Sequence, residues 1–307
     1  MTQFSVVIPC FNAEATITET LHSICVQTLA DFEVICVDDG SSDKTRDLIT
    51  QAQSHDPRVR LVRNTGKGPS DARNLGAICF AQGDIIAFCD ADDLWAPTKL
   101  AELKRVFETE TCDAVFSKIG FFQHSPSDVQ TFSNVPSGAL TIADLLGENP
   151  VGTMSNLSIR KDQFIVSSGF NSDIVHNEDL EWLIRLIGLG ACIIGVDQTL
   201  TYYRANPHGL SADLTAMMQG RNAALRTAKA FGFIPSGADQ AIHMRYLARR
   251  ALRVGVDRTD ALKFAMRGLV ESPVGFFRSP RRGALTLCGA VAALVLPRRT
   301  RQILFSR

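Results

Sequence analysis

The sequence predicts an α/β protein with a mixed, mostly parallel sheet and helices on both faces of that sheet. Three observations support this prediction. Short apolar runs rich in β-branched residues recur over residues 1–122, segments with helical periodicity separate them, and acidic clusters stand where two of the runs end. Ligands of such sheets bind outside the carboxyl ends of the strands, so a functional site is expected at that edge.

The first part of the chain alternates regularly between expected strands and helices. The strands are expected at residues 4–8, 32–37, 59–62, 84–88 and 114–122. The helices are expected at residues 12–25, 45–53, 70–81 and 97–108. Because each of these helices lies between two strands, consecutive strands can run parallel.

Regular alternation ends after residue 122. The next elements expected are a polar loop, two helices and three short strands, at residues 123–139, 140–147, 178–189, 156–160, 192–196 and 199–204. The last two strands bracket Asp197-Gln198. From residue 211 the periodicity is helical, near 211–230, 238–254 and 258–270. We therefore expect one domain over residues 1–210 and a helical C-terminal region over residues 211–307.

Charge is distributed unevenly along a chain whose net charge is zero. Residues 1–235 hold 18 Lys and Arg against 28 Asp and Glu, a net of −10, whereas residues 236–307 hold 14 against 4, a net of +10. An acidic first part suits a metal-dependent site. The basic C-terminal region suits an anionic surface, for which membrane phospholipid and nucleic acid are the two candidates.

Residues 284–296 form an uncharged apolar segment with arginines on both sides. Thirteen helical residues reach about 20 Å, which is too short to cross a bilayer core of roughly 30 Å. The segment could lie in the membrane interface, or it could pack against the protein. Nucleic-acid binding is not expected, because the arginines flank this segment and are not interleaved with stacking aromatic residues.

The cysteines and the N-terminus indicate a reducing compartment. The eight cysteines lie in apolar segments, where buried thiols are expected, and they form no C-x-x-C pair. No basic region or cleavage site precedes the first expected strand. We expect a cytoplasmic protein that associates peripherally with the inner face of the cell membrane through its C-terminal region.

Three carboxylates follow the expected strand 84–88. Asp90 and Asp92 are two residues apart, so in an extended chain they can point the same way and offer oxygen ligands to one divalent cation. Asp93 follows directly. The alternative is that these acids mark a solvated turn.

Two further stretches suggest a nucleotide site. Asp38 and Asp39 end a strand, where a carboxylate can accept a hydrogen bond from a base N–H such as that of uracil, although this stretch could also serve helix capping. Lys67 and Arg73 flank an expected helix start, and such a start with two cations suits a phosphate. The stretch lacks the glycine and lysine order of a Walker loop and the third glycine of a dinucleotide fingerprint.

Taken together, four stretches closely resemble the family-two inverting glycosyltransferases of GT-A fold, of the type that builds bacterial polysaccharides. They are Val7-Ile8-Pro9-Cys10-Phe11-Asn12-Ala13-Glu14, Val37-Asp38-Asp39-Gly40-Ser41-Ser42-Asp43, Gly68-Pro69-Ser70-Asp71-Ala72-Arg73-Asn74 and Asp90-Ala91-Asp92-Asp93. The resemblance covers roughly residues 3–205. It implies that residues 1–210 are a GT-A catalytic domain.

The resemblance also implies roles for individual residues. Pro9, Phe11, Glu14 and Asp39 would line the nucleotide pocket, with Asp38 beside them. Arg73 would lie near the phosphates. Asp92 would bind Mn²⁺ or Mg²⁺, Asp90 would contact the ribose or the metal, and Asp93 is a secondary ligand candidate.

Downstream, the stretch Asn177–Trp182 resembles the acidic pair of this family, whose aspartate is the general base. Asp179 would then be the catalytic base, with Glu178 on the side of the acceptor and the diphosphate. The alternative is that Asn177 caps a helix and the acids favour its positive end. Trp182 could stack on the acceptor sugar or belong to the core.

Residues 202–211 resemble the arginine-containing end of the family's catalytic region. Arg204 could face the diphosphate. His208 could add a nitrogen ligand to the metal or contact a phosphate oxygen, although a lone loop histidine is usually solvated.

These observations predict an inverting, metal-dependent hexosyltransferase. It would move a sugar from a nucleotide-sugar, a UDP-sugar by this interpretation, to a hydroxyl of a glycan or lipid-linked acceptor in cell-surface polysaccharide synthesis. A nucleotidyltransferase is one alternative, but it would need a glycine-rich basic loop after the first strand, where Pro9–Glu14 stands. The other alternative is a non-catalytic nucleotide-binding scaffold protein.

Overall fold

Within the described residues of the computed structural model, 3–205, 213–254 and 257–305, the strands form one nine-stranded mixed sheet. Its order is β3-β2-β1-β4-β8-β6-β9-β5, and β7 pairs with β6. The strands are β1 (Phe4–Cys10), β2 (Phe32–Asp38), β3 (Val59–Arg63), β4 (Ile85–Phe88), β5 (Leu94–Trp95), β6 (Ala114–Phe122), β7 (Thr131–Phe132), β8 (Leu157–Arg160) and β9 (Ile193–Arg204).

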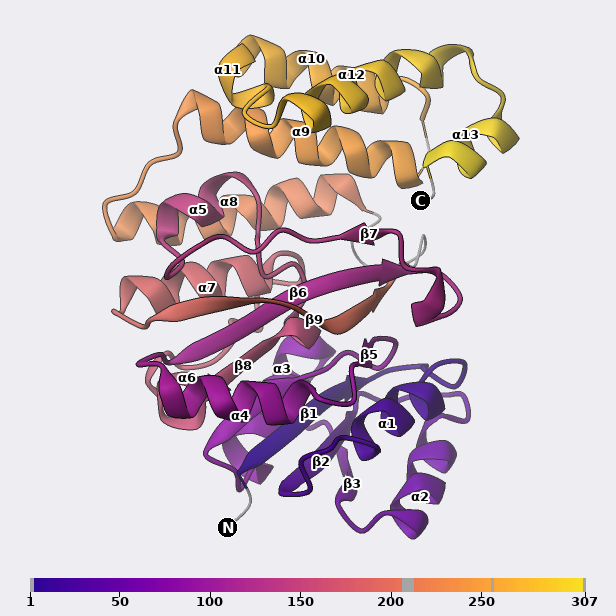
Figure 1. Ribbon diagram of the computed structural model, residues 1–307, viewed down its shortest axis with the longest axis vertical. Helices are drawn as coiled ribbons and strands as arrows, with labels where there is room; N and C mark the ends of the chain where they lie inside the picture. Colours follow the sequence, from indigo (N-terminus) through magenta and orange to yellow (C-terminus); the bar gives the residue numbers. More distant parts are fainter. Residues whose placement is uncertain (1–2, 206–212, 255–256, 306–307) are drawn as a thin grey trace. The chain divides into compact units, whose positions relative to one another are not determined.

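The sheet changes character along its width. Strands β3, β2, β1 and β4 are parallel neighbours, as the alternation of strands and helices predicts. Strand β8 is antiparallel to both β4 and β6, whereas β6 and β9 are parallel. The predicted α/β class with a helical C-terminal region is confirmed (Figure 1).

Helices cover both faces of the sheet. Helices α1 (Ile17–Cys25), α2 (Thr45–His55) and α4 (Lys99–Thr109) share one core cluster with alternate residues of β1, such as Val6 and Ile8. Helix α3 (Gly68–Leu75) packs on the opposite face, where a Cβ on Gly76 would lie 2.5 Å from Cγ1 of Val7. This close approach requires glycine and fixes α3 against the sheet.

The aromatic cluster lies on the same face as α3. Phe88 of β4, Phe164 of α6 (Lys161–Val166), Phe170 and Trp182 of α7 (Glu178–Gly188) pack together, with ring centroids 4.6 to 6.4 Å apart. Trp182 is fully buried, and its Nε1 donates to Oγ of Ser167 at 2.9 Å. The prediction that Trp182 stacks on an acceptor sugar is therefore wrong, because the indole is enclosed in the core.

Several local predictions also differ from the structure. The two short strands expected at 192–196 and 199–204 are one strand, β9, whose register against β6 shifts near Lys118. Nζ of Lys118, on β6, pairs with the carboxylate of Asp197 at 2.5 Å. This ion pair lets the polar Asp197 stay within β9. The helix expected at 70–81 continues beyond α3 as a π-helix over Gly76–Phe80. Short 3-10 helices lie at Pro126–Asp128 and Met154–Asn156.

The chain divides into two units. The first comprises Met1–Leu140 and Pro150–Ala205, and the second comprises Thr141–Asn149 and Asn206–Arg307. The predicted boundary at residue 210 lies outside the described residues.

The second unit is helical and builds its own core. Its helices are α5 (Ile142–Gly147), α8 (Leu214–Ala230), α9 (Gly237–Val254), α10 (Asp260–Glu271), α11 (Pro273–Phe276), α12 (Pro280–Val295) and α13 (Arg298–Phe305). Small side chains such as Ala248, Ala265 and Ala290 surround the fully buried Phe276.

Helix α12 contains most of the apolar segment 284–296. Its small residues Gly289, Ala290 and Ala293 are buried, whereas Leu285 and Val295 are 63% and 80% exposed. Among the described residues, no helix is long and apolar enough to cross a membrane. Two cysteines, at positions 79 and 288, are exposed, so the expectation that all the thiols are buried is wrong for them.

The burial of Trp182 generates a stability prediction. The Trp182→Phe variant loses the indole hydrogen bond and leaves unfilled volume, so its free energy of unfolding should fall by about 1–3 kcal/mol. Urea unfolding followed by circular dichroism measures this loss. Phe132→Leu, at a position that is 46% exposed, is the control and should be near neutral. An unchanged free energy of unfolding in Trp182→Phe would contradict the core assignment.

Candidate active site

The predicted acidic clusters meet at one edge of the sheet. Strands β1, β2 and β4 are parallel neighbours, with Cys10 opposite Asp38 and Val7 opposite Phe88. Their carboxyl ends therefore lie side by side, and the loops that follow them carry the clusters.

The loop after β1 is tied to the loop after β2. The side-chain oxygen of Asn12 accepts from the backbone N–H of Ser42 at 2.9 Å, and a carboxylate oxygen of Glu14 accepts from the N–H of Lys44 at 3.0 Å. Asn12 has a φ of 46°, a left-handed conformation that asparagine tolerates well. Phe11, in the same loop, is 61% exposed. This solvent-facing aromatic ring is available to a planar ligand.

Asp38 and Asp39 have different surroundings. Asp38 is buried, and its carboxylate accepts from the N–H of Ser41 at 3.2 Å, a bond that closes the turn after β2 and does not cap α2, which begins at Thr45. Asp39 accepts from Nδ2 of Asn64 at 2.6 Å and from the N–H of Gly68 at 2.8 Å. These bonds fix the Asp39 carboxylate, whose oxygens can each still accept another hydrogen bond.

Arg73 lies at the centre of the site. Its Nη2 donates to Oδ1 of Asp90 at 2.6 Å, and its Nη1 donates to Oε1 of Glu178 at 3.1 Å. The Arg73 side chain is only 6% exposed and lies over the ring of Phe170. The guanidinium thus joins the acidic motif after β4 to the start of α7, two segments that are far apart in the sequence.

The two acids at the start of α7 are strongly influenced by burial. Burial and the charge of Asp179 raise the pKa of Glu178 to about 7, against the opposing effect of Arg73. Burial also raises the pKa of Asp179. Asn177 precedes the helix with a φ of 59°, and its side chain makes no capping hydrogen bond. The alternative that Asn177 caps α7 through its side chain is therefore not supported.

The three acids after β4 divide into different environments. Asp90 accepts from Oγ1 of Thr153 at 3.2 Å as well as from Arg73. Asp93 is fully buried, and its Oδ1 accepts from the N–H of Arg204 at 2.9 Å. Burial and the charge of Asp90 raise the pKa of Asp92 to about 6.

Asp92 is the acid best suited to a cation. It is half-buried, and in the described part of the chain no other residue donates a hydrogen bond to its carboxylate. A divalent cation would relieve the repulsion between Asp92 and Asp90, so the residues present fit Mn²⁺ or Mg²⁺ with the remaining ligands from water and substrate. No group of three or more His, Cys, Asp or Glu side chains arranged for a metal occurs among the described residues. His208 lies outside them.

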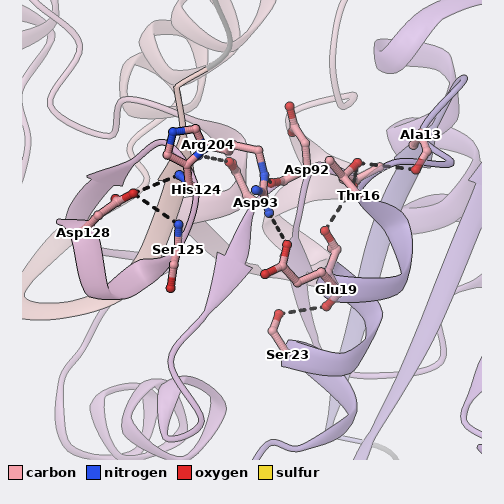
Figure 2. Close-up of polar contacts among 12 residues, drawn as sticks. Ala13, Thr16, Glu19, Ser23, Asp92, Asp93, His124, Ser125, Asp128 and Arg204 are labelled. Atoms are coloured by element: carbon pink, nitrogen blue, oxygen red, sulfur yellow. Dashed lines mark hydrogen bonds and ion pairs between the residues drawn. The ribbon is translucent and has the colours of Figure 1, made fainter. Parts of the chain in front are cut away.

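Arg204 holds the acidic motif from the other side. Figure 2 shows its guanidinium between Asp92 and Glu19: Nε donates to the backbone oxygen of Asp92 at 2.9 Å, and Nη2 pairs with Oε2 of Glu19 at 2.5 Å. The guanidinium also lies over the ring of Phe122 at 4.6 Å. In this arrangement Arg204 positions the backbone of the motif, and its contact with a diphosphate stays a prediction.

Lys67 and Pro9 complete the predicted set. Lys67 is exposed at the start of α3, and its backbone N–H donates to Asp71 at 2.8 Å. Pro9 is half-buried within β1. Both therefore lie at or near the edge of the sheet formed by the carboxyl ends of the strands, where a ligand can reach them.

Sequence reasoning missed the residues that support the site. Thr153 and Ser155 bond to Asp90, Asn64 fixes Asp39, and Glu19 pairs with Arg204. Thr153 and Ser155 are buried polar residues in a stretch without periodicity, so no pattern marked them. Asn64 directly follows β3, and its position at a strand end was a usable signal.

The geometry brings together a phenyl ring, fixed carboxylates and a half-buried carboxylate pair at one sheet edge. Such an edge can bind a nucleotide, a cation and a polar acceptor together.

Comparison with known proteins agrees with this description. Residues 5–164 match the family model described as glycosyl transferase family 2. The chain is 29% identical over 210 residues to the Bacillus subtilis glycosyltransferase TuaG, whose name assigns it to teichuronic acid biosynthesis; the match covers 68% of this chain and 81% of that protein. It is 41% identical over 97 residues to the Escherichia coli glucosyltransferase WfgD, covering 31% of this chain and 37% of that protein.

Solved structures show the same fold. Staphylococcus aureus TarS in complex with UDP has a TM-score of 0.56 at 17% identity, covering 92% of each chain. The mannosyltransferase PcManGT of Pyrobaculum calidifontis, in complex with GDP-Man and Mn²⁺, has a TM-score of 0.61 at 21% identity, covering 99% of this chain and 84% of that one. The predicted GT-A fold is confirmed. Because the family model matches more than half of the sequence, the chain belongs to glycosyl transferase family 2.

Proposed function

We propose that the chain is an inverting hexosyltransferase that moves a sugar from a UDP-sugar to a hydroxyl of a glycan or lipid-linked acceptor in cell-surface polysaccharide synthesis. One observation carries the proposal. Arg73 pairs with both Asp90 and Glu178, so Asp179, the neighbour of Glu178, is held in the same charged network as the acidic motif after β4.

Asp179 has the properties of the base that this reaction needs. In a single displacement, the acceptor oxygen bonds to the anomeric carbon as the bond from that carbon to the diphosphate oxygen breaks. The acceptor proton passes to the carboxylate of Asp179. Burial raises the pKa of this carboxylate, which makes it a stronger proton acceptor than an ordinary aspartate.

Asp92 and Asp90 are the residues we propose to hold Mn²⁺ or Mg²⁺. When bound, the cation supplies positive charge that stabilises the leaving diphosphate. Arg204 and Thr153 keep the loop around these acids in place through hydrogen bonds to Asp92 and Asp90.

The named relatives support the choice of donor. WfgD is named as a transferase that uses UDP-Glc, and TarS has been solved with UDP and with UDP-GlcNAc. Asp39 and the exposed ring of Phe11 are the residues we propose for the uracil base. The names of TuaG and WfgD mention teichuronic acid biosynthesis and a diphosphoundecaprenol-linked acceptor. Both names support the synthesis of a cell-surface polysaccharide as the setting.

We further propose that the first unit is catalytic and that the second lies against the anionic inner face of the cell membrane. The exposed side chains Leu285, Val291 and Val295 of α12 form an apolar stripe on one side of that helix. Residues 236–307 carry a net charge of +10, which complements an anionic lipid surface.

The role of Asp179 is tested by Asp179→Asn. This variant lacks the base and should lower kcat on the order of 10²- to 10⁴-fold. Release of free nucleotide from a panel of sugar nucleotides with Mn²⁺ and acceptor measures it. Asp173→Asn, at an exposed position in the segment that precedes α7, is the matched control and should keep wild-type kcat. Wild-type turnover in Asp179→Asn would reject the base assignment.

The role of Asp92 is tested by metal binding. Asp92→Asn removes one charged oxygen ligand, so its affinity for Mn²⁺ in the presence of UDP should fall at least about tenfold. Isothermal titration calorimetry measures this affinity. Asp31→Asn, an exposed aspartate on the connection before β2, should bind Mn²⁺ as the wild type does. Undiminished Mn²⁺ affinity in Asp92→Asn would exclude Asp92 as a ligand.

The membrane proposal is tested on the apolar stripe. A Leu285→Ser, Val291→Ser, Val295→Ser variant should lose most cosedimentation with phosphatidylglycerol vesicles, because three apolar side chains no longer enter the interface. The control replaces three exposed apolar residues of the first unit: Val26→Ser, Ile78→Ser and Val166→Ser. Equal cosedimentation of both variants would argue against docking through α12.

A further inference from the structure

Three arginines of the second unit surround one carboxylate. Glu148, directly after α5, lies 3.8 Å from Nη2 of Arg245, 4.0 Å from Nη1 of Arg249 and 3.8 Å from Nη1 of Arg282. A fourth arginine, Arg278, is close enough to act electrostatically on Arg245. We call these five residues the arginine cluster.

The cluster carries more positive charge than its own carboxylate can balance. Three guanidinium groups face one acid and Arg278 lies near one of them, so the five residues carry three positive charges in excess. The distances to Glu148 are those of ion pairs and exceed ordinary hydrogen-bond lengths. Burial and the neighbouring guanidinium groups lower the pKa of Arg245 and Arg249, against the effect of Glu148.

The donors of the cluster differ in how they are used. Arg245 is 5% exposed, and its Nη1 donates to the backbone oxygen of Phe276 at 2.8 Å, which anchors it. Arg249 and Arg282 are 30% and 31% exposed, and within the described residues their guanidinium groups make no hydrogen bond. The cluster therefore combines one arginine that is held by a hydrogen bond with two partly exposed arginines whose guanidinium groups can still donate hydrogen bonds.

We propose that the arginine cluster binds a phosphate or diphosphate group. The planar guanidinium fork forms paired hydrogen bonds with phosphate oxygens, and a phosphate offers more acceptor oxygens and more charge to several arginines than a single carboxylate does. A dianion would also neutralise most of the excess charge. The group could belong to a lipid headgroup or to a soluble phosphate compound. The cluster belongs to the second unit, and the proposal does not depend on sugar transfer.

The test uses inorganic diphosphate as the probe, on the full chain, in EDTA and without donor sugar. Isothermal titration calorimetry should show saturable binding by the wild type and on the order of tenfold weaker binding by Arg249→Gln/Arg282→Gln. Arg258→Gln/Arg267→Gln removes the same charge from exposed positions outside the cluster and should bind as the wild type does. Arg249→Lys/Arg282→Lys keeps the positive charge but lacks the guanidinium fork. Its affinity for diphosphate should lie between that of the wild type and that of Arg249→Gln/Arg282→Gln.

Absence of saturable binding by the wild type would overturn the proposal. Equal affinities in wild type and Arg249→Gln/Arg282→Gln, or an equal loss in the control, would also overturn it. Circular dichroism checks that each variant is folded, and the lysine variant keeps the test valid if the glutamine variant is not.

A second arm identifies the source of the phosphate group. The same variants are cosedimented with phosphatidylcholine vesicles that contain or lack phosphatidylglycerol. Loss of phosphatidylglycerol-dependent binding in Arg249→Gln/Arg282→Gln alone supports the site and assigns a lipid headgroup. Retained vesicle binding together with lost diphosphate binding supports the site and assigns a soluble phosphate compound. Because neither arm measures turnover, both results stand whether or not the chain transfers sugar.

Discussion

The pairing of Arg73 with Asp90 and Glu178 is the interaction on which the proposed site depends. A guanidinium that is 6% exposed has lost most of its hydration, and only close, hydrogen-bonded partners offset that cost. Removing either carboxylate would leave a buried charge under-compensated. The pairing therefore holds α3, the end of β4 and the start of α7 in one arrangement.

The same pairing sets the electrostatics around it. Asp179 lies close to Arg73, a cation already shared by two other acids, and burial outweighs that attraction, so the pKa of Asp179 is raised. Burial and the charge of Asp90 raise the pKa of Asp92, against the opposing effect of Arg204. Several carboxylates close together repel one another, and this repulsion is costly. A divalent cation reduces the repulsion by binding the carboxylates, and the hydroxyl of the substrate reduces it by giving up its proton to one of them. Stability and chemistry thus make opposite demands on these acids, which is typical of a functional site.

Sequence reasoning succeeded where a local pattern dictates geometry. The parallel strands β1, β2 and β4 follow from apolar runs and intervening helices, and their alignment brings Asp39 and Asp90 to one edge. It failed where residues far apart in the sequence determine whether a side chain is buried and what it contacts. Trp182 reads as either an exposed or a core residue until α6 and α7 pack, and Thr153 has no periodic neighbours. Strand β9 is continuous although Asp197 is polar, because the partner of Asp197, Lys118, lies on the neighbouring strand β6, where no local pattern reveals it.

The basic C-terminal region illustrates why composition alone leaves two interpretations open. The segment 284–296 could pack on the protein or meet a membrane, and a helix allows both because its residues face opposite sides. In α12, buried glycines and alanines permit close packing, while Leu285, Val291 and Val295 are exposed. The positive charge is divided in a similar way. Arg245 and Arg282 turn toward Glu148 within the second unit, so part of the net charge forms a defined cluster and is not an even surface coat. A defined cluster favours recognition of a particular anionic group, whereas an even coat would favour only general attraction.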